Sequence, residues 1–167
     1  MEKFKRGEGI TKINIGRRSH VYIGNNVNFA NKWEVGYPLT CYLRVKGLGV
    51  LKIWNNVGIN SSAIFCDESV TIKDFVHIGG GCQIFDTNFH NIDYLGRRDP
   101  VLNSLSKTSP VLIEEDVFIG SRCIICKGVT IGARSIVAAG SVVIHNIPPD
   151  ELWGGNPAMF IKKNNQI

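Results

Sequence analysis

Residues 111–143 read VLIEEDVFIGSRCIICKGVTIGARSIVAAGSVV, and this stretch decides the fold. Every sixth position carries an aliphatic residue, namely Ile113, Ile119, Ile125, Ile131, Val137 and Val143. Small or β-branched residues lie two positions ahead of each later one, at Val117, Cys123, Val129, Ser135 and Ser141. A helix repeats near 3.6 residues and a half-buried strand near 2, so a sustained period of six fits neither element alone.

A period of six fits a flat-sided coil. Each hexad supplies one short strand and a corner, with an inward aliphatic residue, a small inward residue, and Gly or Ala where the backbone turns. Three hexads, about 18 residues, close one triangular turn of a parallel β-helix with a continuous aliphatic core. The same register is found upstream at Ile72, Ile78 and Ile84, and with slips at Ile53, Ile59, Ile23 and Phe29. We therefore predict an all-β parallel β-helix whose repeats run from about residue 10 to residue 148.

The composition agrees with one globular domain over residues 1–167. A hydrophobic content of 44% is enough to bury a core, which excludes a disordered chain. The net charge of +5 comes mostly from residues 1–18, where six bases face two acids. A basic end alone does not choose between nucleic acid, lipid and a phosphorylated ligand. Because no nucleic-acid-binding motif accompanies it, we expect no nucleic-acid partner.

The chain is expected to be cytoplasmic. Its charged first residues are not followed by an apolar run, so no signal or transit peptide is readable. The longest nearly apolar stretch, residues 136–144, is far shorter than the roughly 20 residues that span a bilayer. An odd number of cysteines, five, indicates reduced thiols instead of a disulfide framework.

Two stretches interrupt the repeat and attract functional interest, because loops on a rigid scaffold tend to carry chemistry. The first, residues 30–42, either lines a ligand cleft or caps an adjoining coil. The second, residues 86–110, is an inserted loop that contains His90. After the last hexad, residues 149–167 are expected to form a cap, because a solenoid must close its open end.

The repeat, the run Ala138-Ala139-Gly140-Ser141-Val142-Val143 and the tail Gly155-Asn156-Pro157-Ala158 resemble the hexapeptide-repeat acyltransferases. The resemblance is to the branch of maltose, galactoside and polysaccharide O-acetyltransferases. It implies a left-handed β-helix, acetyl-CoA as the acyl donor, a sugar hydroxyl as the acceptor, and a homotrimer whose active sites are shared between subunits.

In that branch one histidine of the inserted loop takes the proton of the acceptor hydroxyl, and His90 occupies this place. An alcohol is a poor nucleophile at neutral pH, and a neutral imidazole within hydrogen-bond reach accepts its proton in the transition state. The ring needs an orienting partner on its other nitrogen. Asp86 and Asp93 are the nearby carboxylates, and we favour Asp86 because it lies where the loop leaves the coil.

The resemblance also implies the coenzyme site. Residues 18 apart stack on one face, so Ser121 lies beneath Ala139, and these positions match those whose main-chain amides bind the pantetheine arm in related enzymes. Gly120 and Ala138 keep the neighbouring wall shallow.

The carboxyl-terminal segment supplies three further candidates for coenzyme binding. Lys162 and Lys163 either meet the coenzyme phosphates or belong to a solvated tail, and Trp153 is placed near the adenine.

The acceptor is less defined. Arg97 and Arg98 either bind a carboxylate or phosphate of the acceptor, as guanidinium groups do, or anchor the loop. Asn88 and Asp93 offer partners for sugar hydroxyls. Two other functions stay open: an N-acetyltransferase of an amino sugar or nucleotide-linked amino sugar, and a β-helical scaffold without enzymatic activity.

The remaining histidines and cysteines are assigned no chemistry. His20, His77 and His145 are too far apart in sequence to form a close pair of metal ligands, so we expect no metal site. Cys123 and Cys126 have redox spacing, but the hexads account for both as packing residues.

Overall fold

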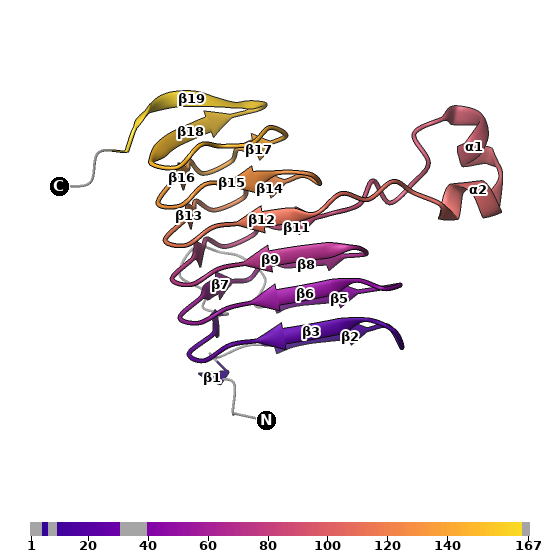
Figure 1. The fold of residues 1–167 in the computed structure, drawn as a ribbon, viewed down its shortest axis with the longest axis horizontal. Coiled ribbons are helices and arrows are strands. Elements are labelled where there is room, and N and C mark those ends of the chain that lie inside the picture. The colour runs from indigo at the N-terminus through magenta and orange to yellow at the C-terminus, as the bar shows by residue number, and fades with distance from the viewer. Residues whose placement is uncertain (1–4, 7–9, 31–39, 165–167) are drawn as a thin grey trace.

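A computed structural model describes residues 5–6, 10–30 and 40–164 of the chain. The predicted interruption at residues 30–42 therefore lies mostly outside the described residues. Short strands are stacked in successive coils from the amino-terminal to the carboxyl-terminal end (Figure 1). Each coil contributes one strand to each of three sheets, so that the stack has three flat faces.

The eight-stranded sheet contains, in spatial order, β1 (Lys5–Arg6), β4 (Asn28–Ala30), β7 (Gly58–Asn60), β10 (His77–Ile78), β13 (Phe118–Ile119), β16 (Ile136–Val137), β18 (Glu151–Gly155) and β19 (Ala158–Lys163). The six-stranded sheet contains β17 (Val142–Val143), β14 (Ile124–Ile125), β11 (Gln83–Phe85), β8 (Ala63–Cys66), β5 (Thr40–Val45) and β2 (Ile10–Ile15). The five-stranded sheet contains β15 (Thr130–Ile131), β12 (Val111–Ile113), β9 (Ser69–Ile72), β6 (Val50–Ile53) and β3 (His20–Ile23). We call these the first, second and third faces.

Strand pairing confirms the predicted period. Phe118 pairs with Ile136, which lies 18 residues further along the chain, and both strands run parallel. The same offset joins Ile124 to Val142 on the second face. An upstream coil is longer: Val50 pairs with Ser69, which lies 19 residues further along the chain. A coil of more than 18 residues shifts the hexad register, as the slips in the earlier hexads do.

The core is the aliphatic column that the hexads predict. All six aliphatic positions from Ile113 to Val143 are at most 1% exposed, and so are the five small positions between them. Successive strand residues point to opposite sides of a sheet, so buried side chains alternate along each strand with more exposed ones. The column continues down to Val27 and Phe29 without a break in the buried cluster.

The repeat is interrupted between β11 and β12, and the intervening residues form an arm that projects away from the stacked coils (Figure 1). Two short helices lie at its end, α1 (Tyr94–Arg98) and α2 (Pro100–Ser104). Asp93 caps α1 by accepting a hydrogen bond from the Gly96 N–H, 2.7 Å away. Asp99 caps α2, in which Pro100 is the first residue. An aspartate before a helix, with proline at its first position, is a normal helix start.

Two antiparallel strands, β18 and β19, close the carboxyl-terminal end of the first face. β18 is the last strand that continues the parallel ladder, since Val137 pairs with Trp153. β19 then turns back along β18 and is itself the last strand of this sheet.

Candidate functional site

His90 lies on the projecting arm, and its imidazole is exposed. Its Nδ1 is 3.1 Å from Nδ2 of Asn103, which comes from the end of α2. The Oδ1 of Asn103 accepts the backbone N–H of Asn91, also at 3.1 Å. With its oxygen engaged in this way, the Asn103 carboxamide donates to Nδ1, so the neutral ring carries its proton on Nε2. For Nε2 to act as the base, the ring proton must be on Nδ1. The Asn103 carboxamide must then turn its oxygen toward Nδ1 to accept that proton's hydrogen bond.

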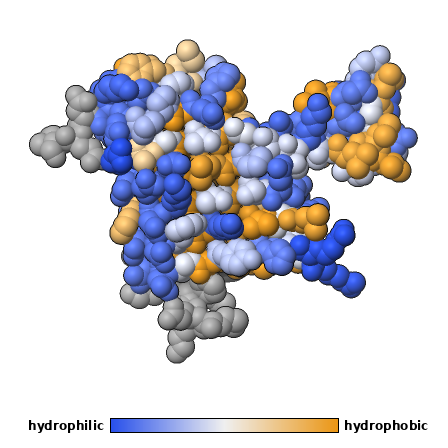
Figure 2. Space-filling model, in the orientation of Figure 1, coloured by the Kyte–Doolittle hydropathy of each residue, from blue (hydrophilic) through white to orange (hydrophobic). Residues whose placement is uncertain are grey.

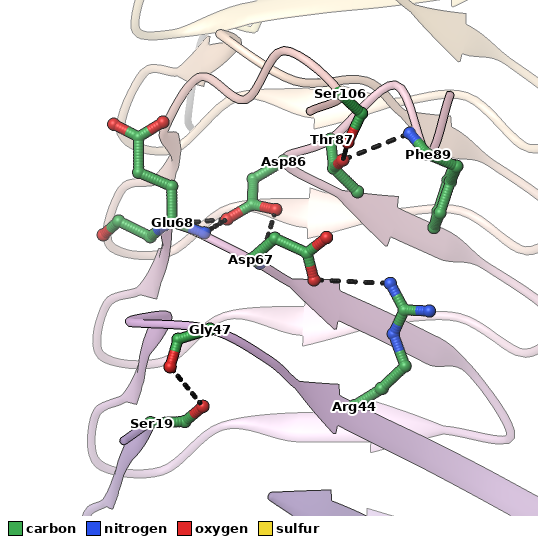
Figure 3. A network of polar contacts seen from close by, with 10 residues as sticks. Ser19, Arg44, Gly47, Asp67, Glu68, Asp86, Thr87, Phe89 and Ser106 are labelled. Carbon is green, nitrogen blue, oxygen red and sulfur yellow. Dashed lines mark hydrogen bonds and ion pairs between the residues drawn. The ribbon is translucent and has the colours of Figure 1, made fainter. Parts of the chain in front are cut away.

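Asp86 has a different place from the one that the sequence predicted. Its fully buried carboxylate accepts the backbone N–H groups of Asp67, Glu68 and Ser69 at 2.7–2.8 Å (Figure 3). Burial raises the pKa of the Asp86 carboxyl, and these three hydrogen bonds act in the opposite direction. Asp86 therefore fixes the corner between β8 and β9 beneath the arm, whereas Asn103 is the residue that contacts the His90 ring.

An aromatic cluster holds the base of the arm against the second face. Phe89, the neighbour of His90, packs edge-on against Phe65 with ring centroids 5.4 Å apart. The guanidinium of Arg44 lies over both rings, at 4.9 Å from the Phe65 centroid and 5.5 Å from the Phe89 centroid. Arg44 also forms an ion pair with Asp67 at 3.3 Å (Figure 3).

A hydroxyl pair adds to this anchorage. The Thr87 hydroxyl accepts the Phe89 N–H and lies 3.1 Å from the Ser106 hydroxyl (Figure 3). The first and last parts of the arm are thereby joined next to His90. Sequence reasoning missed Asn103, Arg44, Phe65 and Phe89, because no repeat or motif marks them.

The four candidate acceptor residues of the arm separate into two groups. Arg97 donates from its guanidinium to the backbone carbonyls of Asn91 and Ile92, and the guanidinium of Arg98 lies 5.5 Å from the Tyr94 ring centroid. Arg97 thus has contacts of the kind an anchor makes, Arg98 contacts a residue of its own helix, and Asp93 is a helix cap. Asn88 differs from them. Its Nδ2 is buried and has no hydrogen-bond partner within the part of the chain that the structure describes.

The predicted coenzyme positions are stacked as expected at the corner between the first and second faces. The Gly140 N–H donates to the Ser121 carbonyl at 2.8 Å, which joins two successive corners. Gly120 permits this close stacking, because a Cβ there would lie only 2.6 Å from the Ala139 nitrogen. Neither the Ser121 nor the Ala139 N–H finds an acceptor among the described residues. Ala138 is half-buried beside them.

Two of the three candidates near the carboxyl terminus are engaged within the cap. The carboxylate of Glu151 accepts the indole N–H of Trp153 and the ammonium of Lys163, each at 2.7 Å. These two contacts lower the pKa of Glu151. Trp153 also packs edge-on against Phe160. Lys162 is exposed on β19.

The other polar candidates are dispersed. His20, His77 and His145 are exposed on separate coils. Within the described residues, no three His, Cys, Asp or Glu side chains come together as metal ligands would. All five cysteines are free; Cys123 lies in the core and Cys126 is half-buried. None of the described helices is both long enough and apolar enough to cross a membrane.

Comparison with known proteins agrees with this architecture. Residues 110–144 match the sequence model described as the hexapeptide repeat of succinyl-transferase. A 2,3,4,5-tetrahydropyridine-2,6-dicarboxylate N-acetyltransferase of Clostridium perfringens is 50% identical over 62 residues, which are 37% of this chain and 26% of that protein. The chain spans about half or less of the length of the curated relatives that it matches.

Solved structures extend the similarity over nearly the whole chain. A hexapeptide-repeat acetyltransferase of Vibrio cholerae, complexed with acetyl-CoA, has a TM-score of 0.61 and 28% identity. That comparison covers 98% of this chain and 73% of the other. A galactoside acetyltransferase in complex with coenzyme A has a TM-score of 0.62 and 27% identity, over 87% of this chain and 65% of the other.

The fold class predicted from the sequence, a left-handed parallel β-helix, is thereby confirmed. The six-residue period, the three parallel faces and these similarities together show that residues 110–144 carry hexapeptide repeats and that the chain has the fold of the hexapeptide-repeat acetyltransferases of known structure.

Proposed function

We propose that the protein is an acetyl-CoA-dependent O-acetyltransferase that acts on a hydroxyl group of a sugar or glycan precursor. The observation that carries this proposal is that one chain has both an exposed histidine on the arm and a corner whose backbone amides, those of Ser121 and Ala139, have no acceptor among the described residues. The amides of Ser121 and Ala139 are donors suited to the amide oxygens of a pantetheine arm. The solved relatives that contain acetyl-CoA or coenzyme A support this donor.

In the proposed reaction His90 acts as the general base. The acceptor hydroxyl gives its proton to a ring nitrogen while its oxygen attacks the thioester carbonyl carbon. The carbon–sulfur bond then breaks, and the departing thiolate takes the proton from the imidazolium. The products are an acetyl ester and free coenzyme A. The Asn103 carboxamide sets which ring nitrogen is free to accept the proton.

We call the corner formed by Ser121 and Ala139 the coenzyme corner. We further propose that the active enzyme is a homotrimer in which the arm of one subunit reaches the coenzyme corner of another. The arm leaves the coils at the corner between the second and third faces, whereas Ser121 and Ala139 lie at the corner between the first and second. Apolar side chains gather at the end of the arm (Figure 2), among them Ile92, Val101 and Leu105. A second copy of the chain is a natural partner for them.

The free cysteines suit a reducing compartment, and we place the enzyme in the cytoplasm. The whole chain, residues 1–167, would then form one catalytic domain.

Two measurements test the activity. Calorimetric titration with acetyl-CoA should show saturable binding, and thiol release should appear with one member of a panel of sugars and nucleotide sugars. His90→Ala should lower kcat roughly 10²–10⁴-fold, as expected for loss of a general base. His145→Ala, another exposed histidine, serves as the control and should leave the rate unchanged. A folded protein that does not bind acetyl-CoA would instead be a β-helical scaffold.

An N-acetyltransferase is the second candidate, and the Clostridium perfringens relative favours it. A neutral amine is a better nucleophile than an alcohol and depends less on a base. If an amino sugar is the acceptor, His90→Ala should retain much of the parental rate. If the parent acetylates a hydroxyl acceptor and His90→Ala loses nearly all of that turnover, the N-acetyltransferase alternative is excluded.

A further inference from the structure

A hollow of about 570 Å³ lies on the outer surface of the first face, across β4, β7, β10 and β13. A glycine lies in the outward-facing ladder of this face. Asn28, Gly58 and His77 are neighbours in that ladder, and Gly58 contributes no side chain. A Cβ at Gly58 would lie only 2.9 Å from Nδ1 of His77, so the imidazole occupies the space over the glycine.

The hollow is lined by carboxamide, imidazole, aliphatic and aromatic side chains. Its polar side chains are carboxamides, including those of Asn28 and Asn60, and the imidazole of His77; none of the described residues that line it is Asp, Glu, Lys or Arg. The rings of Phe75 and Phe118 complete the wall, and each residue is about half exposed. Carboxamides pair with hydroxyl groups as donors and acceptors, while aromatic rings cover the C–H faces of a sugar.

Phe75 has a backbone conformation that its side chain does not favour. Its φ is +59°, and the equivalent corner residues of the other coils have φ between +56° and +60°. All of these residues except Arg134 are Asn or Asp: Asn26, Asn56, Asp116 and Asp150. Asn and Asp tolerate this region well, whereas a bulky aromatic residue there is a conformational outlier. Burial offers no compensation, because Phe75 is 53% exposed. Strain that packing does not repay is typical of functional positions.

The hollow also adjoins the coenzyme corner. Gly79 lines it, and a Cβ at Gly79 would lie 2.6 Å from the Ser121 nitrogen. A molecule in the hollow is thus next to the amides proposed to hold the pantetheine arm. We infer that the hollow binds the acceptor as an uncharged sugar ring, with Phe75 as its stacking surface; this inference rests on the proposed function.

Two variants test the inference without removing any residue from the core. Phe75→Asn restores the residue type of the neighbouring corners, so it should raise the melting temperature by about 2–4 °C while weakening sugar binding about 10-fold. Gly58→Ala adds a methyl group against His77 and should weaken sugar binding by a similar factor. Tyr22→Asn, which changes an aromatic residue of similar exposure on β3, is the matched control and should leave sugar binding unchanged.

The probes are methyl glycosides of glucose, galactose and N-acetylglucosamine, with glucuronate and glucose 1-phosphate as charged analogues. Binding is measured by saturation-transfer NMR on the full chain with acetyl-CoA present. We expect at least one neutral glycoside to bind, and both hollow variants to weaken it while acetyl-CoA binding stays unchanged.

Several results would overturn the inference. These are binding of only the charged sugars, binding of no neutral glycoside, or glycoside binding that neither variant alters. A change of sedimentation coefficient in Phe75→Asn would show that the hollow is a contact between copies of the chain. Failure of acetyl-CoA itself to bind would reject the proposed function, which distinguishes the two failures.

Discussion

At the scale of single residues, the contact between Asn103 and His90 determines how the imidazole can act. The carboxamide stands between the His90 ring and the Asn91 amide, and its orientation decides which ring nitrogen carries the proton. Correct tautomer and orientation are as important for a general base as its presence. In the proposed reaction Asn103 is a positioning residue, and its effect should appear in the pH dependence of the rate.

Two substitutions at Asn103 separate orientation from packing. Asn103→Asp supplies an oxygen to Nδ1 in either orientation, so activity should persist, and the acid limb of kcat/KM should move to higher pH because a carboxylate stabilises the imidazolium. Asn103→Leu leaves the ring without a partner and should lower kcat by about 10²-fold. Pre-steady-state thiol release measured between pH 5 and 9 checks both. Equal rates for Asn103→Leu and the parent would show that the contact has no role.

Asp86 offers the second prediction at this scale. Asp86→Asn replaces one acceptor oxygen by an NH₂ group that faces buried N–H donors, so the free energy of unfolding should fall by about 1–3 kcal/mol. Urea unfolding measures this loss. Asp74→Asn, at a half-buried carboxylate that accepts the Asn55 N–H, is the control and should cost less. Unchanged stability together with lost turnover would restore the catalytic role that the sequence suggested for Asp86.

At the scale of elements, the antiparallel pair β18–β19 depends on the charge of one carboxylate. Lys163 and Trp153 lower the pKa of Glu151 below its ordinary value of 4.5. A carboxyl with a lowered folded pKa adds stability that is fully present above the pKa of the unfolded chain and is lost as the pH falls through the folded value. The ion pair therefore supports the cap at neutral pH and fails in acid.

This behaviour is visible in a comparison with Glu151→Gln. The melting temperature of the parent should exceed that of the variant at pH 7, and the difference should shrink as the pH falls below about 4.5. Differential scanning calorimetry from pH 3 to pH 7 provides the measurement. A difference that does not depend on pH would mean that the two contacts of Glu151 act without its charge.

At the scale of the whole molecule, the base of the arm packs on the coils through Phe89, whereas its end projects away from them (Figure 1). It presents Val101 and Leu105 to solvent with about 70% of each residue exposed. A monomer gains nothing from such exposure, whereas an assembly buries it. The proposed trimer thus accounts both for the arm's surface and for the separation of His90 from the coenzyme corner.

Leu105→Asp combined with Val101→Asp should convert the assembly to monomers and lower kcat, because the histidine would no longer be held at a neighbouring corner. Sedimentation velocity gives the oligomeric state directly. Leu48→Asp is the matched control, since Leu48 is as exposed as Leu105 but lies at a corner of the coils. An unchanged sedimentation coefficient in the double variant would contradict the role of the arm.

The sequence by itself determined the β-helix, its buried column from Ile113 to Val143, and the place where the arm interrupts it. These features were predictable because each hexad repeats the same pattern of one aliphatic and one small inward residue. Residues 18 apart then stack in successive coils. It also placed His90 on the arm and Ser121 beneath Ala139.

Only the tertiary structure decided what surrounds them. The helices of the arm bring Asn103 to His90, the backbone amides of residues 67–69 donate to the Asp86 carboxylate, and four successive coils form the hollow beside Phe75. No period relates these residues to one another. Their contacts depend on how a non-repeating segment folds back, or on which outward side chains adjoin across successive coils, and local spacing determines neither.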